Sequence, residues 1–279
     1  MAVKQRTMTS RASALAATRV AGTGHSTRTL VMLHGIYGRG RNWQAIARAL
    51  VAARPEYACW LVDLPHHGRS GPGRHGDTVA GLALDLQDWA GADRIEVDAI
   101  LGHSFGGKVA LSFATGRSAA PLQAWIIDST PEVNSPSGSA WDMLDVVRRL
   151  PDRFPSREDA AVAIEAEGFA PGVAQWMSAN LAREGDAFVW RLDFDAMERL
   201  LRDFFTTDLW EAVENPPAHL DLHFLKASQS NALSADAVRR IEAAASRSVR
   251  LHHRDGGHWI HAESPAVVTA LLVEHLPGD

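Results

Sequence analysis

The sequence places a serine between two glycines, in Gly102-His103-Ser104-Phe105-Gly106, directly after an apolar run typical of a buried strand. A strand, a sharp turn and a helix are the context in which such a serine acts as a nucleophile, because the turn lifts its hydroxyl clear of the sheet. Flanking glycines leave room where a Cβ would collide with neighbouring backbone. The pattern therefore predicts Ser104 as a nucleophile and the Phe105 amide, at the start of the helix, as an oxyanion donor.

A serine hydroxyl is a weak nucleophile at neutral pH and needs an adjacent base. Among the thirteen histidines, His258 is the best candidate, because it lies in a glycine-rich loop, Asp255–Trp259, that follows the last predicted strand. We therefore expect the imidazole of His258 to take the serine proton and to pass it to the leaving group.

The acid that orients this histidine is less obvious, and three carboxylates are considered. Asp128 ends the predicted strand Trp125–Ile127, at the carboxyl edge of the sheet, where functional sites gather in open α/β sheets. The loop Ala227–Asn231 follows the next predicted strand and contains no carboxylate, and Asp236 reads as an early residue of a helix. We predict Asp128 as the acid, and Asp255, three residues before the histidine, remains its rival.

A second oxyanion donor is expected from the loop after the first secure strand, Thr29–Leu33. That strand runs into the turn 34–38, and the backbone amide of Ile36 is the predicted donor. Residues beside Ser104, His258 and Ile36 in the sequence are expected to contact the substrate. They are His34, Gly35, Tyr37, His103 and Trp259.

Two histidine pairs, His66-His67 and His252-His253, could suggest a metal site. Adjacent residues on a strand point to opposite faces, however, and no set of Cys, Asp or Glu completes either pair. We therefore expect no metal and no organic cofactor. The single cysteine, Cys59, excludes an intramolecular disulfide and falls in an apolar strand pattern, so it is predicted to be a core residue.

Predicted strands alternate with predicted helices along most of the chain, which indicates a doubly wound, mostly parallel sheet covered on both faces. Residues 18–134 and 216–279 are predicted to form this α/β core, after a weakly ordered tail at 1–17. Between them, residues 135–215 read as helix after helix without a convincing strand, and hold four of the nine tryptophans. This segment is therefore predicted to be an inserted helical cap.

Composition limits the possible partners. The 28 basic and 33 acidic residues give a net charge of −5, so no basic face is implied and neither nucleic acid nor an anionic membrane is an expected partner. No apolar run is long enough to span a bilayer, and the first twenty residues make a poor secretory signal. We expect a cytoplasmic monomer or homodimer that acts on a small molecule.

Residues 29–279 resemble the serine α/β-hydrolases, and in particular the esterase branch of abhydrolase-domain proteins known from bacteria and mitochondria. The resemblance is carried by LGHSFGGKVAL, HGIYGRGRNW, DLPHHGRS, IIDSTP and GHWIHAESP, while FVWRLDFDAMERLLRDF resembles the cap of that branch. Lys108 and an acid at the position of Asp128 are typical of it. One departure is the loop Lys226-Ala227-Ser228, where the family usually has glycine.

The resemblance implies hydrolysis of short- to medium-chain acyl esters or thioesters through an acyl-enzyme, without a cofactor. Two rival functions use the same residues. One is carbon–carbon bond hydrolysis or cofactor-free perhydrolysis on a similar Ser/His/Asp set. The other is a catalytically silent hydrolase fold that serves as a binding module, against which a complete set of catalytic residues argues.

Overall fold

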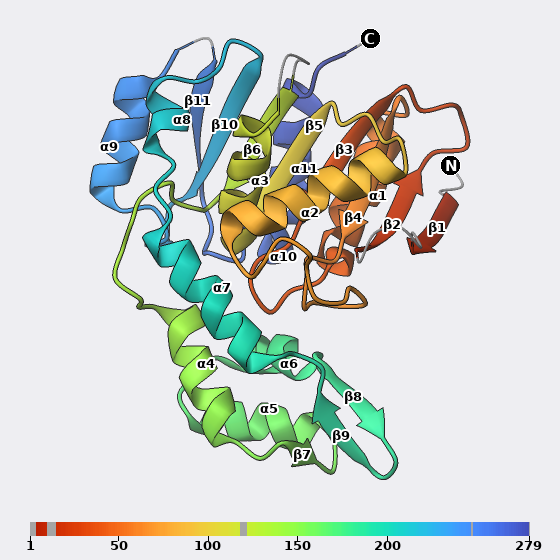
Figure 1. The fold of residues 1–279 in the computed structure, drawn as a ribbon, viewed down its shortest axis with the longest axis vertical. Coiled ribbons are helices and arrows are strands. Elements are labelled where there is room, and N and C mark those ends of the chain that lie inside the picture. Colours follow the sequence, from red (N-terminus) through yellow and green to blue (C-terminus); the bar gives the residue numbers. More distant parts are fainter. Residues whose placement is uncertain (1–3, 10–14, 118–121, 247, 279) are drawn as a thin grey trace.

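An eight-stranded, mostly parallel sheet forms the centre of the computed structural model, which describes residues 4–9, 15–117, 122–246 and 248–278 (Figure 1). The strand order is β1-β2-β4-β3-β5-β6-β10-β11, and only the pairs β1–β2 and β2–β4 are antiparallel. The strands are β1 (Lys4–Thr9), β2 (Ala16–Ala21), β3 (Arg28–Leu33), β4 (Tyr57–Val62), β5 (Ala99–His103), β6 (Leu122–Ile127), β10 (Leu220–Ala227) and β11 (Val249–Arg254).

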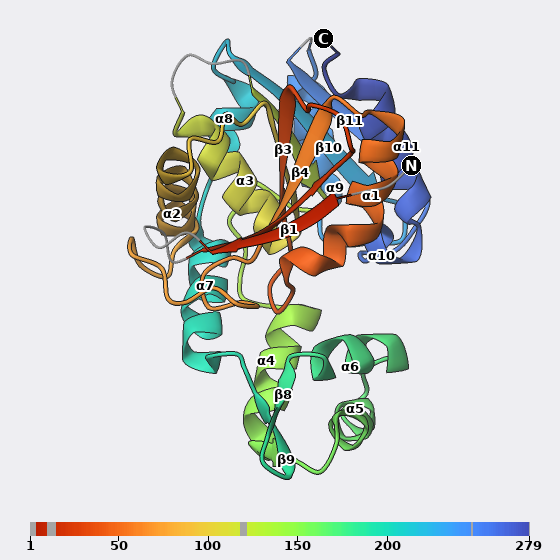
Figure 2. The same cartoon turned by 90° about the vertical axis from the view of Figure 1, so that its right-hand side faces the viewer.

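Helices cover both faces of this sheet, as the alternation in the sequence predicts (Figure 2). One apolar cluster packs α1 and α11 on one face, and a larger cluster packs α2 and α3 on the other. The helices of the core are η1 (Gly40–Trp43), α1 (Gln44–Ala53), α2 (Val79–Ala92), α3 (Phe105–Thr115), α8 (Trp210–Glu214), α9 (Ala235–Ala244), α10 (Ile260–Glu263) and α11 (Pro265–His275). Among the described residues, no helix combines the length and the apolar character that crossing a membrane requires.

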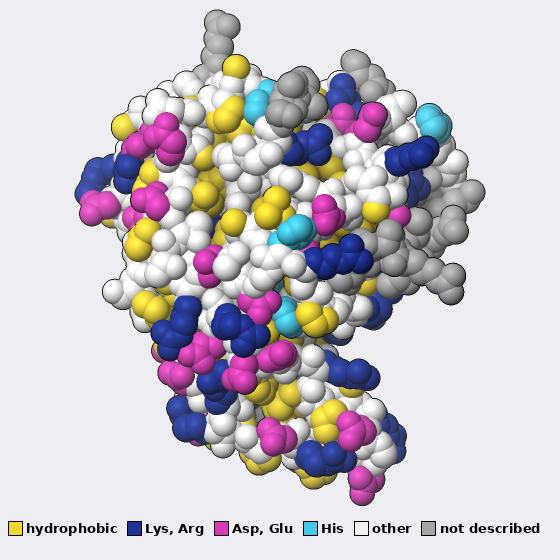
Figure 3. Space-filling view, in the orientation of Figure 1, with side chains coloured by type: hydrophobic (Ala, Val, Ile, Leu, Met, Phe, Trp, Pro, Cys, Tyr) yellow, Lys and Arg dark blue, Asp and Glu magenta, His cyan; other side chains and the backbone are white. Residues whose placement is uncertain are grey.

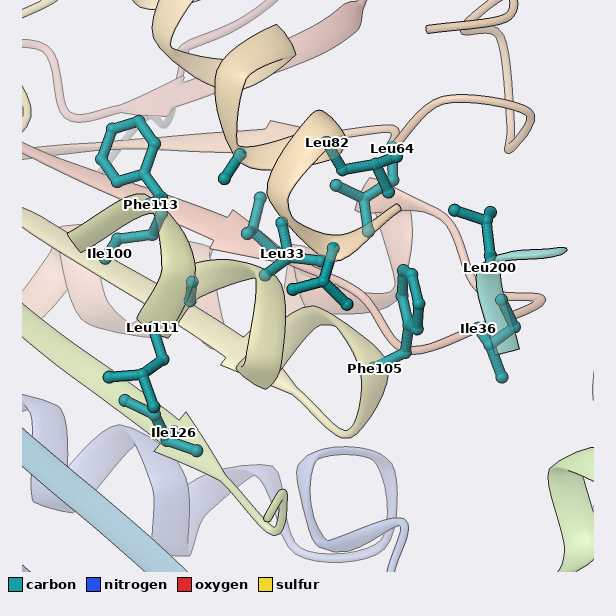
Figure 4. Packing of buried hydrophobic residues seen from close by; sticks show 14 of the residues in the cluster. Leu33, Ile36, Leu64, Leu82, Ile100, Phe105, Leu111, Phe113, Ile126 and Leu200 are labelled. Carbon is teal, nitrogen blue, oxygen red and sulfur yellow. The ribbon is translucent and has the colours of Figure 1, made fainter. Parts of the chain in front are cut away.

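The helix α3, which follows the predicted nucleophile, is fixed by apolar contacts with the sheet beneath it (Figure 4). Leu111 and Phe113 of this helix lie in the same buried cluster as Ile100 of β5 and Ile126 of β6. Burying side chains of this size removes roughly 1.5–3 kcal/mol of unfavourable hydration each. The start of α3 is therefore held rigidly at the carboxyl edge of the sheet.

Residues 139–206, between β6 and α8, form a separate layer below that edge (Figure 1). It contains a small antiparallel sheet of order β7-β9-β8, so the prediction of a purely helical cap was wrong. The strand pattern is hard to see in the sequence because these strands are two to four residues long and only partly buried. The elements are α4 (Ser139–Arg149), β7 (Arg153–Phe154), α5 (Arg157–Ala166), α6 (Pro171–Ser178), β8 (Leu181–Glu184), β9 (Ala187–Trp190) and α7 (Phe194–Thr206).

The prediction of a weakly ordered tail at residues 1–17 was also wrong in part. Residues 4–9 form β1, which pairs with β2 in register from Lys4 opposite Ala21 to Thr9 opposite Ala16. Residues 1–3 and 10–14, which the prediction also covered, lie outside the described residues. The edge position of β1 explains why the sequence signal is weak, since an edge strand need not be apolar on either face.

Candidate active site

Ser104 lies at the sharp turn between β5 and α3, with the backbone angles φ 52° and ψ −121°. Its amide donates to the carbonyl oxygen of Ile127 at 3.0 Å. A Cβ at Gly102 would lie 1.9 Å from the carbonyl oxygen of Gly106, and a Cβ at Gly106 would lie 2.3 Å from that of His34. Both glycines are therefore required by close backbone approach. A positive φ is unfavourable for serine, so the surrounding packing must stabilise this conformation. Residues with such strained backbone are common at functional sites.

Asp128 and His258 meet beside this turn. The distance between Oδ2 of Asp128 and Nδ1 of His258 is 2.7 Å, and the other carboxylate oxygen accepts the backbone amide of Ala227 at 3.1 Å. The carboxylate is fully buried, whereas the imidazole is 26% exposed. Asp128 also has a positive φ, 47°, which turns its side chain out of the strand direction. With Nδ1 facing a carboxylate, the imidazole carries its proton there and leaves Nε2 free to accept another.

The two rival carboxylates lie elsewhere. Asp255 is exposed and accepts a hydrogen bond from the Ser228 hydroxyl at 3.2 Å. Asp236 is an exposed first-turn residue of α9 and pairs with Arg239 in the same helix. Both carboxylates are engaged in the local contacts expected of a loop and a helix start, and the carboxylate on His258 is that of Asp128.

The buried His103, predicted as a substrate contact, also holds the backbone of His258. Its Nε2 donates to the carbonyl oxygen of His258 at 2.7 Å, and the two ring centroids are 4.6 Å apart. Burial, together with His261 and His258, lowers the pKa of His103 well below its ordinary value, so this ring is neutral. Sequence reasoning missed this positioning contact, because nothing in the sequence pairs residue 103 with the backbone of residue 258.

The two amides predicted to bind an oxyanion are unpaired. In the part of the chain that the structure describes, the amides of Ile36 and Phe105 donate to no protein acceptor. The loop that carries Ile36 lies directly against the nucleophile, since a Cβ at Gly35 would be 3.5 Å from Cβ of Ser104. The loop of Ile36 and the turn of Ser104 and Phe105 therefore adjoin, which an oxyanion hole built from both amides would require.

Tyr37 ties this loop to both the core and the cap layer. Its hydroxyl donates to the carbonyl oxygen of Ala140 at 2.8 Å, and its carbonyl oxygen accepts from the side chain of Asn180 at 2.8 Å. Its amide donates to Nε2 of His67 at 3.2 Å. Three contacts from different elements thus fix a residue whose φ of 62° is unfavourable for a tyrosine.

His34 was predicted to contact substrate, but its ring bonds the backbone of two loops beside the site. Its Nδ1 donates to the carbonyl oxygen of Gly35 at 2.7 Å, and its Nε2 accepts the amide of Leu64 at 3.0 Å. It lines neither of the cavities at Ser104. Burial lowers the pKa of His34 to about 4 and that of His67 to about 3, so both rings are neutral acceptors.

Lys108, on the first turn of α3, is 1% exposed and joins three segments. Its Nζ donates to the carbonyl oxygens of Glu132 at 2.9 Å, Phe204 at 2.6 Å and Thr207 at 2.9 Å. Residue 132 lies where the chain leaves the core for the cap layer, and residues 204 and 207 lie where it returns. The helix behind the serine is therefore bonded to both ends of that layer.

Ser104 and His258 both line two cavities that differ in size and in lining. The larger, about 670 Å³, is lined chiefly by hydroxyl and amide side chains such as Ser129, Asn134 and Gln229, and also by Asp128. The smaller, about 70 Å³, is lined by apolar side chains from the cap layer and by predicted contact residues. They include Gly35, Ile36, Tyr37, His103, Met143, Phe169, Val173, Trp176 and Trp259. The serine thus lies between a large cavity of mixed lining and a small apolar one.

In the described residues, no group of three or more His, Cys, Asp or Glu side chains is arranged to hold a metal ion. Cys59 is buried on β4, and burial raises the pKa of its thiol to about 12, which suits the predicted core role.

Comparison with known proteins agrees with this geometry. The family model "Alpha/beta hydrolase family" matches residues 30–271. The "sn-1-specific diacylglycerol lipase ABHD11" of Danio rerio is 27% identical over 263 residues, which cover 91% of this chain and 80% of the relative. "Lipase LipV" of Mycobacterium tuberculosis is 26% identical, over 88% of this chain and 92% of the relative. The solved structure titled "Marine microorganism esterase" has a TM-score of 0.76 at 21% identity and covers 98% of this chain and 99% of that one.

Proposed function

The chain belongs to the alpha/beta hydrolase family, and we propose that it hydrolyses short- to medium-chain carboxylic esters or thioesters through an acyl-enzyme on Ser104. The observation that carries this proposal is the 2.7 Å contact between Asp128 and His258, whose ring lines the same cavities as the serine. A nucleophile, a base and an orienting carboxylate in that order are the requirements of acyl transfer through a serine.

In the proposed reaction, the Ser104 hydroxyl attacks the substrate carbonyl while Nε2 of His258 takes its proton. Asp128 holds the imidazole in the required tautomer and stabilises the cation that forms. The amides of Ile36 and Phe105 donate to the oxyanion, and removing one such donor from a related site costs about 10²–10³ in turnover. The imidazolium then protonates the leaving group, and a water activated by the same base releases the acid.

The two cavities suggest how a substrate divides between them. The acyl chain fits the small compartment, because apolar side chains such as Val173 and Trp176 line it. The leaving group fits the larger one, where hydroxyls and amides offer hydrogen bonds to an alcohol or thiol arm. The limited volume of the apolar side, about 70 Å³, favours short acyl groups over long ones.

A series of p-nitrophenyl esters from acetate to dodecanoate tests this function. We expect the purified protein to turn over these esters, with the highest kcat/KM for the shorter acyl groups. Turnover by Ser104→Ala should be about a millionth of the parent rate or less. Met143→Trp, which fills the apolar compartment, should restrict activity to acetate. Failure of every ester and of matched thioesters to react, with the protein folded, would reject the proposal.

A further inference from the structure

A third cavity, separate from the two at Ser104, is lined by arginines. It has a volume of about 600 Å³ and lies between the loop after β3 and the loop after β4. Four arginines and one carboxylate are among the described residues that line it. The lining residues are Thr18, Arg39, Arg41, Gln44, Arg48, Leu61, Asp63, Gly68 and Arg69.

The carboxylate among these lining residues, that of Asp63, accepts a backbone hydrogen bond with each of its oxygens. The Oδ1 atom of Asp63 accepts the amide of Gly40 at 2.8 Å, and Oδ2 accepts the amide of Arg69 at 3.0 Å. The guanidinium group of Arg69 lies 3.5 Å from the same carboxylate and donates to the Thr18 hydroxyl at 3.1 Å. Asp63 therefore connects the loops around the cavity, and its charge also acts on Arg69 and raises the pKa of Arg39.

The guanidinium groups of Arg39 and Arg41 form no ion pair with any carboxylate of the described residues. Burial and the charge of Arg41 lower the pKa of Arg39, and the charge of Arg157, from the cap helix α5, acts in the same direction. The opposite arrangement is found on the face in Figure 3, where charges of both signs are interspersed over α7. In one ion pair between α4 and α7, Arg148 lies 2.6 Å from the carboxylate of Asp195.

We propose that the arginine-lined cavity is an anion-binding site for phosphate groups. Guanidinium groups donate in pairs to phosphate oxygens, and an anion would relieve the repulsion among cations that converge on one concavity. Arg39 is only three residues beyond Ile36, so their Cα atoms are at most about 11 Å apart. The cavity shares no lining residue with the two at Ser104, so the kinetic comparison below decides between a free anion and one carried by a substrate, and the second case depends on the proposed function.

Binding of the anion itself is tested first, without catalysis. Inorganic phosphate and coenzyme A are titrated into Ser104→Ala by calorimetry, with and without the added substitutions Arg39→Gln and Arg41→Gln. We expect binding to the parent that weakens as salt rises, and at least about tenfold weaker binding after the arginine substitutions. A matched control, Arg74→Gln with Arg183→Gln, removes two exposed arginines outside the cavity and should leave affinity unchanged.

Kinetics then distinguish a phosphate carried by the substrate from a free anion. Acetyl-coenzyme A and the acetyl thioester of N-acetylcysteamine present the same acyl group, but only the first carries phosphates. If the substrate supplies the anion, Arg39→Gln with Arg41→Gln lowers the ratio of kcat/KM for the two thioesters at least about tenfold. If a free anion is the ligand, phosphate binding weakens while this ratio stays the same.

The proposal would be overturned if Ser104→Ala bound neither phosphate nor coenzyme A at low salt. Equal losses of affinity in the arginine variant and in the matched control would also overturn it. Because these titrations use Ser104→Ala, they succeed or fail independently of hydrolysis. The proposed function could therefore be wrong while the anion site stands, and the reverse result would be equally clear.

Discussion

The carboxylate of Asp128 and the imidazole of His258 are 130 positions apart in the sequence and 2.7 Å apart in the structure. Asp128 directly follows β6, and His258 lies in the loop after β11, with β10 between the two strands in the sheet. The second oxygen of Asp128 bonds the last residue of β10, Ala227. The intervening strand thus fixes the carboxylate at the position from which it reaches the histidine.

Asp128→Asn should lower turnover of an activated ester by roughly 10²-fold or more, because an amide favours the wrong tautomer and removes the counter-charge of the imidazolium. The measurement is kcat on one p-nitrophenyl ester. Asp255→Asn and Asp236→Asn are the controls and should stay within about tenfold of the parent, since both side chains make only local contacts. Near-normal turnover by Asp128→Asn beside a crippled Asp255→Asn would mean that the acid is misassigned.

Much of this fold follows from patterns in the sequence. The predicted strand Thr29–Leu33 begins one residue inside β3 (Arg28–Leu33), and its last four residues are buried and apolar. The elbow around Ser104 was predictable because a strand, two glycines and a helix must occur together for that turn. In the cap layer, the short strands β7, β8 and β9 carry too few alternating residues to give a readable period.

The contacts that support the site were not predictable in the same way. His34 and His103 were predicted as substrate contacts. His34 lines neither cavity at Ser104, whereas His103 lines the smaller one, and both rings also bond backbone carbonyl oxygens. Which ring nitrogen faces which backbone atom depends on tertiary packing between distant loops. The hydrogen bond from the Tyr37 amide to Nε2 of His67 depends on such packing, because it joins the loop after β3 to the loop after β4.

His67→Leu should lower kcat more than tenfold while leaving KM nearly unchanged. The substitution leaves the Tyr37 amide buried without its acceptor, at a cost of about 1–3 kcal/mol, and releases the loop that carries the Ile36 amide. Steady-state kinetics on one ester measure the split, and the exposed His253→Gln is the control. A loss confined to KM would show that His67 does not act through the oxyanion loop.

Lys108→Met should reduce the free energy of unfolding by roughly 2–5 kcal/mol, because three buried carbonyl oxygens lose their donor. Urea unfolding at neutral pH gives the value. Since the same bonds join α3 to both ends of the cap layer, kcat/KM should fall as well. Unchanged stability would mean that water replaces the ammonium and that the three contacts contribute little.

Stability should fall as the pH drops from about 6.5 towards 4. Burial lowers the pKa of His34 to about 4 and those of His67 and His261 to about 3. An unfolded histidine titrates near pH 6.5, so in this interval the unfolded chain binds more protons than the folded one. Each such residue contributes stability that is complete above about pH 6.5 and is reduced by about 2 kcal/mol at pH 5.

Urea unfolding at pH 7.5 and at pH 5 measures this dependence. His261→Phe removes one of the neutral rings and should make the loss of stability smaller, whereas the exposed His253→Gln should not. Equal or greater stability at pH 5 would contradict the assignment of these rings as neutral.

The most direct test of the central claim is the position of a covalent adduct formed with a fluorophosphonate probe, which reacts with activated serines. Intact-protein and peptide mass spectrometry should find one adduct per chain, on Ser104. Labelling should be absent in Ser104→Ala and strongly slowed in Asp128→Asn, because attack requires a base held in the correct tautomer. An adduct on another residue, or equal labelling of Ser104→Ala, would contradict the identification of Ser104 as the nucleophile.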